Sequence, residues 1–170
     1  MILKDSGKRR LFNTGAARDI AEGKGRCDLL PLVTISAVTQ DKILQCIGEY
    51  IYIGDTSCII AALLLFVTQR YKNVYDALLE VSKQYEDGAN KYLPRNWERG
   101  IPLHCYVDSG VRHYLKFMRG DTDEPHDRAF VWNMLGLLWT HENLPKMHDL
   151  PFNETRECVD DGNDVCEAVE

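Results

Sequence analysis

Four acidic residues between positions 86 and 127 have the types and spacing needed to bind a hard divalent cation. Glu124 and Asp127 are three residues apart at an expected helix start, where both carboxylates would share one face. Asp108 and Glu86 lie on the two preceding expected helices. Carboxylate oxygens are ligands for Mg²⁺ and Mn²⁺. We therefore predict a catalytic metal centre formed by Glu86, Asp108, Glu124 and Asp127; first-turn acids are also ordinary N-terminal charges of helices.

Basic residues surround these acids in the sequence and would suit a triphosphate. Arginine forks bind phosphate oxygens in pairs, and lysine adds a compact charge. The predicted phosphate contacts are Lys24, Arg26, Lys91, Arg112 and His113. For His113 the alternative is a hydrogen-bonded interior histidine, and His104, His126, His141 and His148 are not spaced as a metal triad.

Asn96 and Trp97 are the predicted nucleoside contacts. An amide can recognise a base or ribose edge, and an indole can stack on a base. The alternative is that Trp97 closes one end of a helical bundle while Asn96 serves as a turn residue.

Helical spacing of apolar residues dominates the rest of the chain and predicts an all-α bundle. Proline at the start and glycine after the end support the helix at 102–120, and a proline also starts the last helix. No stretch alternates with period two over several strands. The expected helices cover residues 32–48, 57–71, 74–90, 102–120 and 125–145, and the apolar run 58–67 is expected to be a buried segment, too short to span a membrane.

Three regions are predicted along the 170 residues. Residues 1–31 form an extended, glycine-containing arm that contributes to the site, and 32–152 form the helical domain. Residues 153–170 form an acidic tail that is expected to be disordered. The formal charge of −6 argues against nucleic acid as a partner.

The cysteines and the first residues indicate a cytoplasmic protein without a zinc site. None of the six cysteines forms a C-x-x-C pair, and the polar sequence after Lys8 does not resemble a signal peptide. No membrane association is expected.

Several short motifs occur in order along the chain. They are TGAARDIAEGKGRCDLLP at 14–31, followed within 85–138 by EDGANKY, RNWERGIP, DSGVRHYLK and RGDTDEPHDRAFVWN. The chain resembles the phage-encoded dATP/dGTP diphosphohydrolase family, which is similar to MazG-type all-α nucleotide pyrophosphohydrolases and includes the MazZ proteins of phages that replace adenine by 2-aminoadenine.

The resemblance implies a MazG-like helical bundle that assembles as a homo-oligomer, a dimer or tetramer. It also implies Mg²⁺- or Mn²⁺-dependent cleavage of a purine deoxynucleoside triphosphate to the monophosphate and pyrophosphate. The MazG pattern has paired acids three residues apart on two helices. This chain has Lys83 and Cys105 in two of those places, so only Glu86 and Asp108 fit the pattern directly.

The function we predict is hydrolysis of dGTP to dGMP and pyrophosphate, which would supply dGMP for 2-aminoadenine phage DNA. One alternative is a housecleaning pyrophosphohydrolase of broader specificity with the same ligands and another base pocket. The other is a non-catalytic nucleotide-binding or assembly protein, in which the carboxylates are surface charges and the aromatic residues form an interface.

Overall fold

Helices make up most of the computed structural model, which describes residues 7–153. They are α1 (Leu32–Thr39), α2 (Lys42–Ile53), α3 (Thr56–Arg70), α4 (Val74–Tyr92), α5 (Leu103–Arg119) and α6 (His126–Asn143). Short 3-10 helices are η1 (Cys27–Leu29), η2 (Asn96–Arg99) and η3 (Pro145–Met147). The arm adds two antiparallel strands, β1 (Arg9–Leu11) and β2 (Ala17–Asp19), with Arg9 opposite Asp19. The all-α prediction is confirmed. The predicted acidic tail, from residue 154 onward, lies outside the described residues.

Polar side chains that cap helix N-termini explain where several helices begin. Asp41 accepts hydrogen bonds from the backbone N–H groups of Ile43 and Leu44 at the start of α2. Asp55 and Asn73 cap α3 and α4 in the same way. These contacts satisfy N–H groups that have no partner within the helix.

The single helix predicted over 32–48 is wrong, because the chain forms α1 and α2 instead. Gln40 adopts the left-handed conformation, with φ of 59°, and ends α1. Asp41 then caps the next helix. The apolar spacing continues across the break, so periodicity alone does not reveal it. The other four predicted helices begin and end within about two residues of the observed positions.

The hydrophobic core lies where α2, α3, α5 and α6 meet. Phe66 of α3 packs edge to face on Phe130 of α6, with ring centroids 4.6 Å apart. Gly136 of α6 lies against the ring of the fully buried Tyr106 of α5. The expectation that the segment 58–67 is buried is correct for only one face, because Ile60 and Leu64 remain 47% and 59% exposed.

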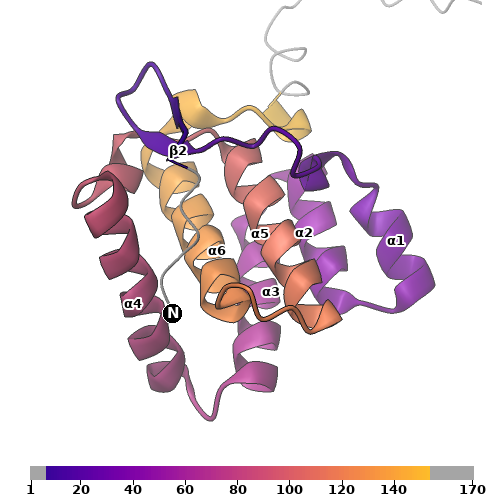
Figure 1. Ribbon diagram of the computed structural model, residues 1–170. Coiled ribbons are helices and arrows are strands. Elements are labelled where there is room, and N and C mark those ends of the chain that lie inside the picture. Colours follow the sequence, from indigo (N-terminus) through magenta and orange to yellow (C-terminus); the bar gives the residue numbers. More distant parts are fainter. Residues whose placement is uncertain (1–6, 154–170) are drawn as a thin grey trace, which may run out of the picture.

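Figure 1 shows α5 and α6 in the middle of the bundle, α4 on one side, and α1 with α2 on the other. The β hairpin lies across one end of the bundle, and the chain then runs along this end to η1. The arrangement leaves the second half of α4 facing α5 and α6 beneath the arm. Within residues 7–153, none of the helices combines the length and the apolar character that crossing a membrane requires.

Candidate active site

A cleft of about 1030 Å³ lies between the arm, the second half of α4 and the facing sides of α5 and α6. Its volume suits a small organic ligand with several phosphates. Seven Lys or Arg residues and four Asp or Glu residues line the cleft. The cleft is therefore basic although the whole chain carries a formal charge of −6. That local excess of positive charge favours an anionic ligand.

Ion pairs and hydrogen bonds fix the hairpin over the cleft. Asp19 of β2 pairs with Lys91 of α4 at 2.5 Å and with Arg9 of β1 at 3.2 Å. Arg18 donates to the carbonyl oxygen of Cys105 at 3.1 Å and to Oδ1 of Asn133 at 2.9 Å. One strand is thus attached to α4, α5 and α6. The predicted phosphate contact Lys91 lines the cleft, with its ammonium already paired.

Asp108 and Arg112 attach the rest of the arm to α5. Asp108 is buried, its Oδ1 accepts from the backbone N–H of Cys27 at 2.7 Å, and its Oδ2 pairs with Arg112. Arg112 also donates to the carbonyl oxygens of Lys24 and Gly25, each at 3.2 Å. Both residues also line the cleft. Their side chains hold the arm in place, so each can act on a ligand indirectly through that segment.

Two other acids of the cleft lining are unengaged. Among residues 7–153, the carboxylates of Glu86 and Glu124 make no ion pair or hydrogen bond. Within the same part of the chain, the Lys24 ammonium also has no acidic partner. These three side chains line the cleft and have no oppositely charged partner in the described part of the chain. They can therefore receive a cation or a phosphate without first breaking an internal contact.

Asp127 does not join the other predicted ligands. It is absent from the cleft lining, and its Oδ2 accepts from Nε of Arg70 at 2.8 Å. The prediction that Glu124 and Asp127 share one helix face is wrong, because α6 begins at His126 and Glu124 precedes the helix. Spacing of three residues places side chains on one face only where both residues are helical. Of the four predicted ligands, the structure brings Glu86, Asp108 and Glu124 to the cleft.

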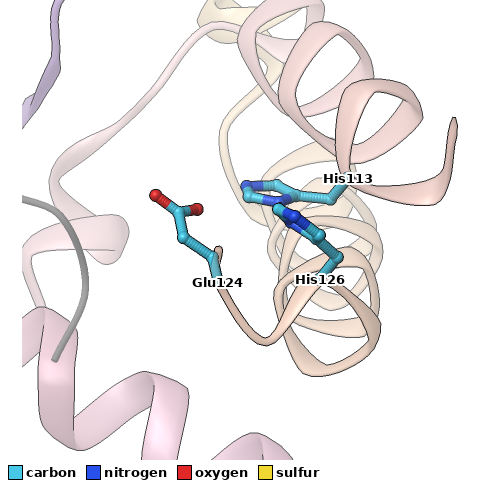
Figure 2. Close-up of side chains that lie close together, drawn as sticks. All are labelled: His113, Glu124 and His126. Carbon is cyan, nitrogen blue, oxygen red and sulfur yellow. The ribbon is translucent and has the colours of Figure 1, made fainter. Parts of the chain in front are cut away.

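Two histidines meet beside Glu124 at the turn between α5 and α6. Nδ1 of His113 lies 2.9 Å from Nδ1 of His126, and Nε2 of His126 lies 2.8 Å from Oδ1 of Asp123. One potential ligand atom from each of His113, Glu124 and His126 lies within 4.8 Å of the others. Figure 2 shows the two rings close together, with the Glu124 side chain extending beside them. This set can hold a metal ion.

The surroundings of the cluster favour a neutral His113 and an ionised Asp123. Burial, followed by the neighbouring His126, lowers the pKa of His113 to about 3. A hydrogen bond from Lys116, followed by one from His126, holds the pKa of Asp123 well below its usual range. The sequence did not indicate this cluster, because the folded turn at 120–125 is what brings His126 back to His113.

The predicted nucleoside contacts occupy different positions. Oδ1 of Asn96 accepts from the backbone N–H of Ala17 at 2.9 Å, and its Nδ2 donates to the Ala17 carbonyl at 2.8 Å. The Asn96 amide therefore fixes β2. Trp97 packs edge to face with Tyr85 and Trp139, at centroid distances of 5.8 and 4.9 Å. It still lines the cleft, together with other aromatic rings.

Arg26 lies outside the main cleft. Its guanidinium forms two hydrogen bonds with the Asp28 carboxylate, at 2.7 and 2.6 Å. It borders a smaller cavity of about 310 Å³, which His104 and Cys105 also line. The structure therefore separates Arg26 from Lys24, although the two are only two residues apart in the sequence.

An all-α bundle with a basic cleft, aromatic walls and unpaired carboxylates is suited to a hydrolase of nucleoside polyphosphates. A protein-family comparison agrees: the family model described as "dATP/dGTP diphosphohydrolase, N-terminal" matches residues 61–150, more than half of the chain. The chain belongs to the dATP/dGTP diphosphohydrolase family and is a nucleoside triphosphate pyrophosphohydrolase. The predicted family and enzyme class are thereby confirmed.

The matched region runs from α3 through η3 and contains all cleft residues from α4, α5 and α6. The hairpin and the arm residues that close the cleft precede it. Searches of curated proteins and of solved structures gave no match.

Proposed function

We propose that the cleft binds dGTP and hydrolyses it to dGMP and pyrophosphate with the help of Mg²⁺ or Mn²⁺. The observation that carries this proposal is the pair of unengaged carboxylates, Glu86 and Glu124, in a lining that is otherwise rich in basic groups. A triphosphate needs both kinds of charge: cations to neutralise it, and carboxylates to hold the divalent ion that accompanies it.

Lys24 is the side chain best placed to bind the phosphates directly. Its ammonium makes no contact with an acid in the described part of the chain, whereas Lys91 is paired with Asp19. Arg112 holds the arm segment that carries Lys24. A nucleotide that enters the cleft would then contact the arm on one side and α4 with α5 on the other. The arm would exclude water from the phosphates and strengthen each charged contact.

The donor chemistry of the cleft fits a hard divalent ion, since Glu86 and Glu124 offer carboxylate oxygens. Such an ion, when bound, would neutralise phosphate charge and activate water. In the reaction a water oxygen bonds to phosphorus, the bond between the α- and β-phosphates breaks, and pyrophosphate leaves. An unpaired carboxylate of the lining accepts the proton released by the water. Asp108 positions the arm through Arg112.

The base would lie against the aromatic part of the cleft. Tyr85, Tyr92, Trp97 and Trp132 all line it and offer faces for stacking. The preference for dGTP is drawn from the resemblance to MazZ-like proteins, and so is the role of dGMP in making 2-aminoadenine DNA. We also propose, on the same resemblance, that the protein is related to MazG-type enzymes and that a phage encodes it.

Self-association is also part of the proposal. Six large hydrophobic side chains on α3 and α4 remain exposed, namely Ile60, Leu64, Val74, Tyr75, Leu78 and Leu79. An apolar surface of this kind supports a dimer or tetramer of the chain. Light scattering after size exclusion would give the mass of the assembly, and a single-chain mass would overturn this part of the proposal.

Product analysis tests the proposed reaction. The full chain is incubated with each of the four dNTPs, with Mg²⁺, with Mn²⁺ and with EDTA, and nucleotides and pyrophosphate are separated chromatographically. Formation of dGMP and pyrophosphate from dGTP alone, abolished by EDTA, is the expected result. Hydrolysis of all four dNTPs would instead favour a housecleaning enzyme, and absence of turnover under every condition would overturn the proposed function.

A further inference from the structure

The histidine pair at the turn between α5 and α6 offers ligand chemistry that a purely carboxylate centre lacks. We propose that His113, Glu124 and His126 form a nitrogen and oxygen site for a first-row transition-metal cation. Its place beside the triphosphate rests on the proposed function. The binding of the cation depends only on the cluster itself.

The distances within the cluster suit coordination. Two nitrogen ligands in adjacent positions around one cation lie roughly 3 Å apart when each metal–nitrogen bond is about 2.1 Å. Nδ1 of His113 and Nδ1 of His126 are 2.9 Å apart. A carboxylate oxygen of Glu124 lies within 4.8 Å of the histidine ligand atoms. Rotation of the partly exposed Glu124 side chain would bring this oxygen to the cation.

Asp123 orients one of the two rings. Its Oδ1 lies 2.8 Å from Nε2 of His126, where the ring donates a hydrogen bond to the carboxylate. A neutral His126 with its proton on Nε2 presents a lone pair at Nδ1. Carboxylates that accept from the outer nitrogen of a ligating histidine are typical partners of metal sites. Lys116 contacts Asp123 at 3.0 Å and keeps the carboxylate in place.

His113 can also offer its Nδ1 to a cation while the number of protons on the two histidines stays the same. In the absence of a cation, the lone pair of His126 accepts the Nδ1–H of His113 across the 2.9 Å contact. Binding of a cation would require this proton to move to Nε2 of the same ring, by exchange with water of the cleft that His113 lines. Both Nδ1 atoms then face the cation with lone pairs. The cluster thus has one arrangement without metal and one with metal.

The ligand set determines the class of cation. Two imidazole nitrogens and one carboxylate favour Mn²⁺, Co²⁺ and neighbouring transition metals, whereas Mg²⁺ prefers oxygen ligands and retains its waters. We expect the site to take Co²⁺ or Mn²⁺ in the presence of excess Mg²⁺.

A cobalt titration tests the site without relying on turnover. Visible absorption of Co²⁺ is recorded as the ion is added to the EDTA-treated full chain, with excess Mg²⁺ present. The expected result is saturation at one Co²⁺ per chain with spectral bands typical of nitrogen ligation. Glu124→Gln, His113→Gln and His126→Gln should each weaken binding at least about tenfold, and Asp123→Asn about tenfold. His148→Gln is the matched control, because the His148 ring lies near the other end of α6, where its Nε2 is 2.9 Å from the carbonyl oxygen of His141.

Circular dichroism accompanies each titration. Glu124 and Asp123 are more accessible than His126, so their variants keep the test valid if a histidine variant fails to fold. Unchanged cobalt spectra and affinity in folded Glu124→Gln and Asp123→Asn would overturn the proposed site. Cobalt binding by wild type that these variants lose, without turnover of any dNTP, would support the metal site and contradict the proposed function alone.

Discussion

The acids that attach the arm to the helices differ from the other acids of the cleft, because the former have partners and the latter do not. Asp19 pairs with Arg9 and Lys91, and Asp108 accepts from Arg112 and from the backbone of Cys27. Within residues 7–153, Glu86 and Glu124 line the same cleft without such partners. Acids with internal partners stabilise the fold, whereas acids without such partners can bind a ligand directly. Residue type alone does not separate these two uses.

Removal of an unengaged acid should give the largest effect on activity. Glu124→Gln is expected to lower kcat for dGTP hydrolysis at least 100-fold, which corresponds to about 2.7 kcal/mol of barrier. Stability should not change, because the described structure gives the carboxylate no internal partner. Steady-state kinetics and urea unfolding measure the two effects.

Glu142→Gln is the control, since Glu142 is an exposed glutamate at the other end of α6. Equal loss of activity in both variants would remove the distinction between Glu124 and an ordinary surface acid.

Removal of an engaged acid should instead reduce stability. Asp108→Asn is expected to cost about 3 kcal/mol of unfolding free energy, because it breaks a buried ion pair with Arg112. Urea unfolding monitored by circular dichroism gives this quantity. In Asp121→Asn, which disrupts the surface pair with Arg119, the unfolding midpoint should stay the same. A midpoint in Asp108→Asn equal to that of wild type would show that the arm does not depend on this pair.

Two glycines extend the comparison from the cleft to the core. A Cβ at Gly136 would lie 2.5 Å from the ring of Tyr106, so Gly136→Ala should destabilise by about 1–3 kcal/mol. At Gly88, on the cleft face of α4, a Cβ would meet nothing within 4 Å. Gly88→Ala should therefore stabilise by about 0.5–1 kcal/mol through helix propensity. Thermal unfolding compares the two, and destabilisation of similar size at both positions would contradict this picture of α4.

The smallest expected effect is a dependence of stability on pH. The hydrogen bond with Asp149, followed by the contact with Cys105, raises the pKa of His104 from 6.5 to about 10. The protonated ring stabilises the fold fully below pH 6.5, and this contribution is lost as the pH rises through about 10. Urea midpoints across that range should fall more steeply in wild type than in Asp149→Asn. Parallel curves would show that the pair contributes nothing.

Much of the fold follows from local signals in the sequence. Gly120 ends α5 in the left-handed conformation, as a glycine after an apolar helical run predicts, and Pro102 and Pro125 directly precede the helices. The break at Gln40 could not be predicted, because glutamine carries no preference for positive φ and the apolar spacing continues through it.

The site was less accessible to sequence reasoning, because its residues acquire their roles through long-range contacts. Asn96 has the right chemistry for recognising a base, but the strand Ala17–Asp19 folds back to take up its amide. His126 gains its candidate role from a partner 13 residues away. The segment 85–128, which the sequence singled out for its basic and acidic residues, does supply much of the lining of the cleft.

The central claim is that the nucleotide binds in the cleft beneath the arm. Hydrogen exchange of the full chain, with and without a dGTP analogue that carries a non-hydrolysable α–β bridge, tests it in the presence of Mn²⁺. Protection from exchange is expected at 17–24, 84–97 and 105–116, with unchanged exchange over α1 and α2. Tight binding of the analogue without protection of these three segments would contradict it.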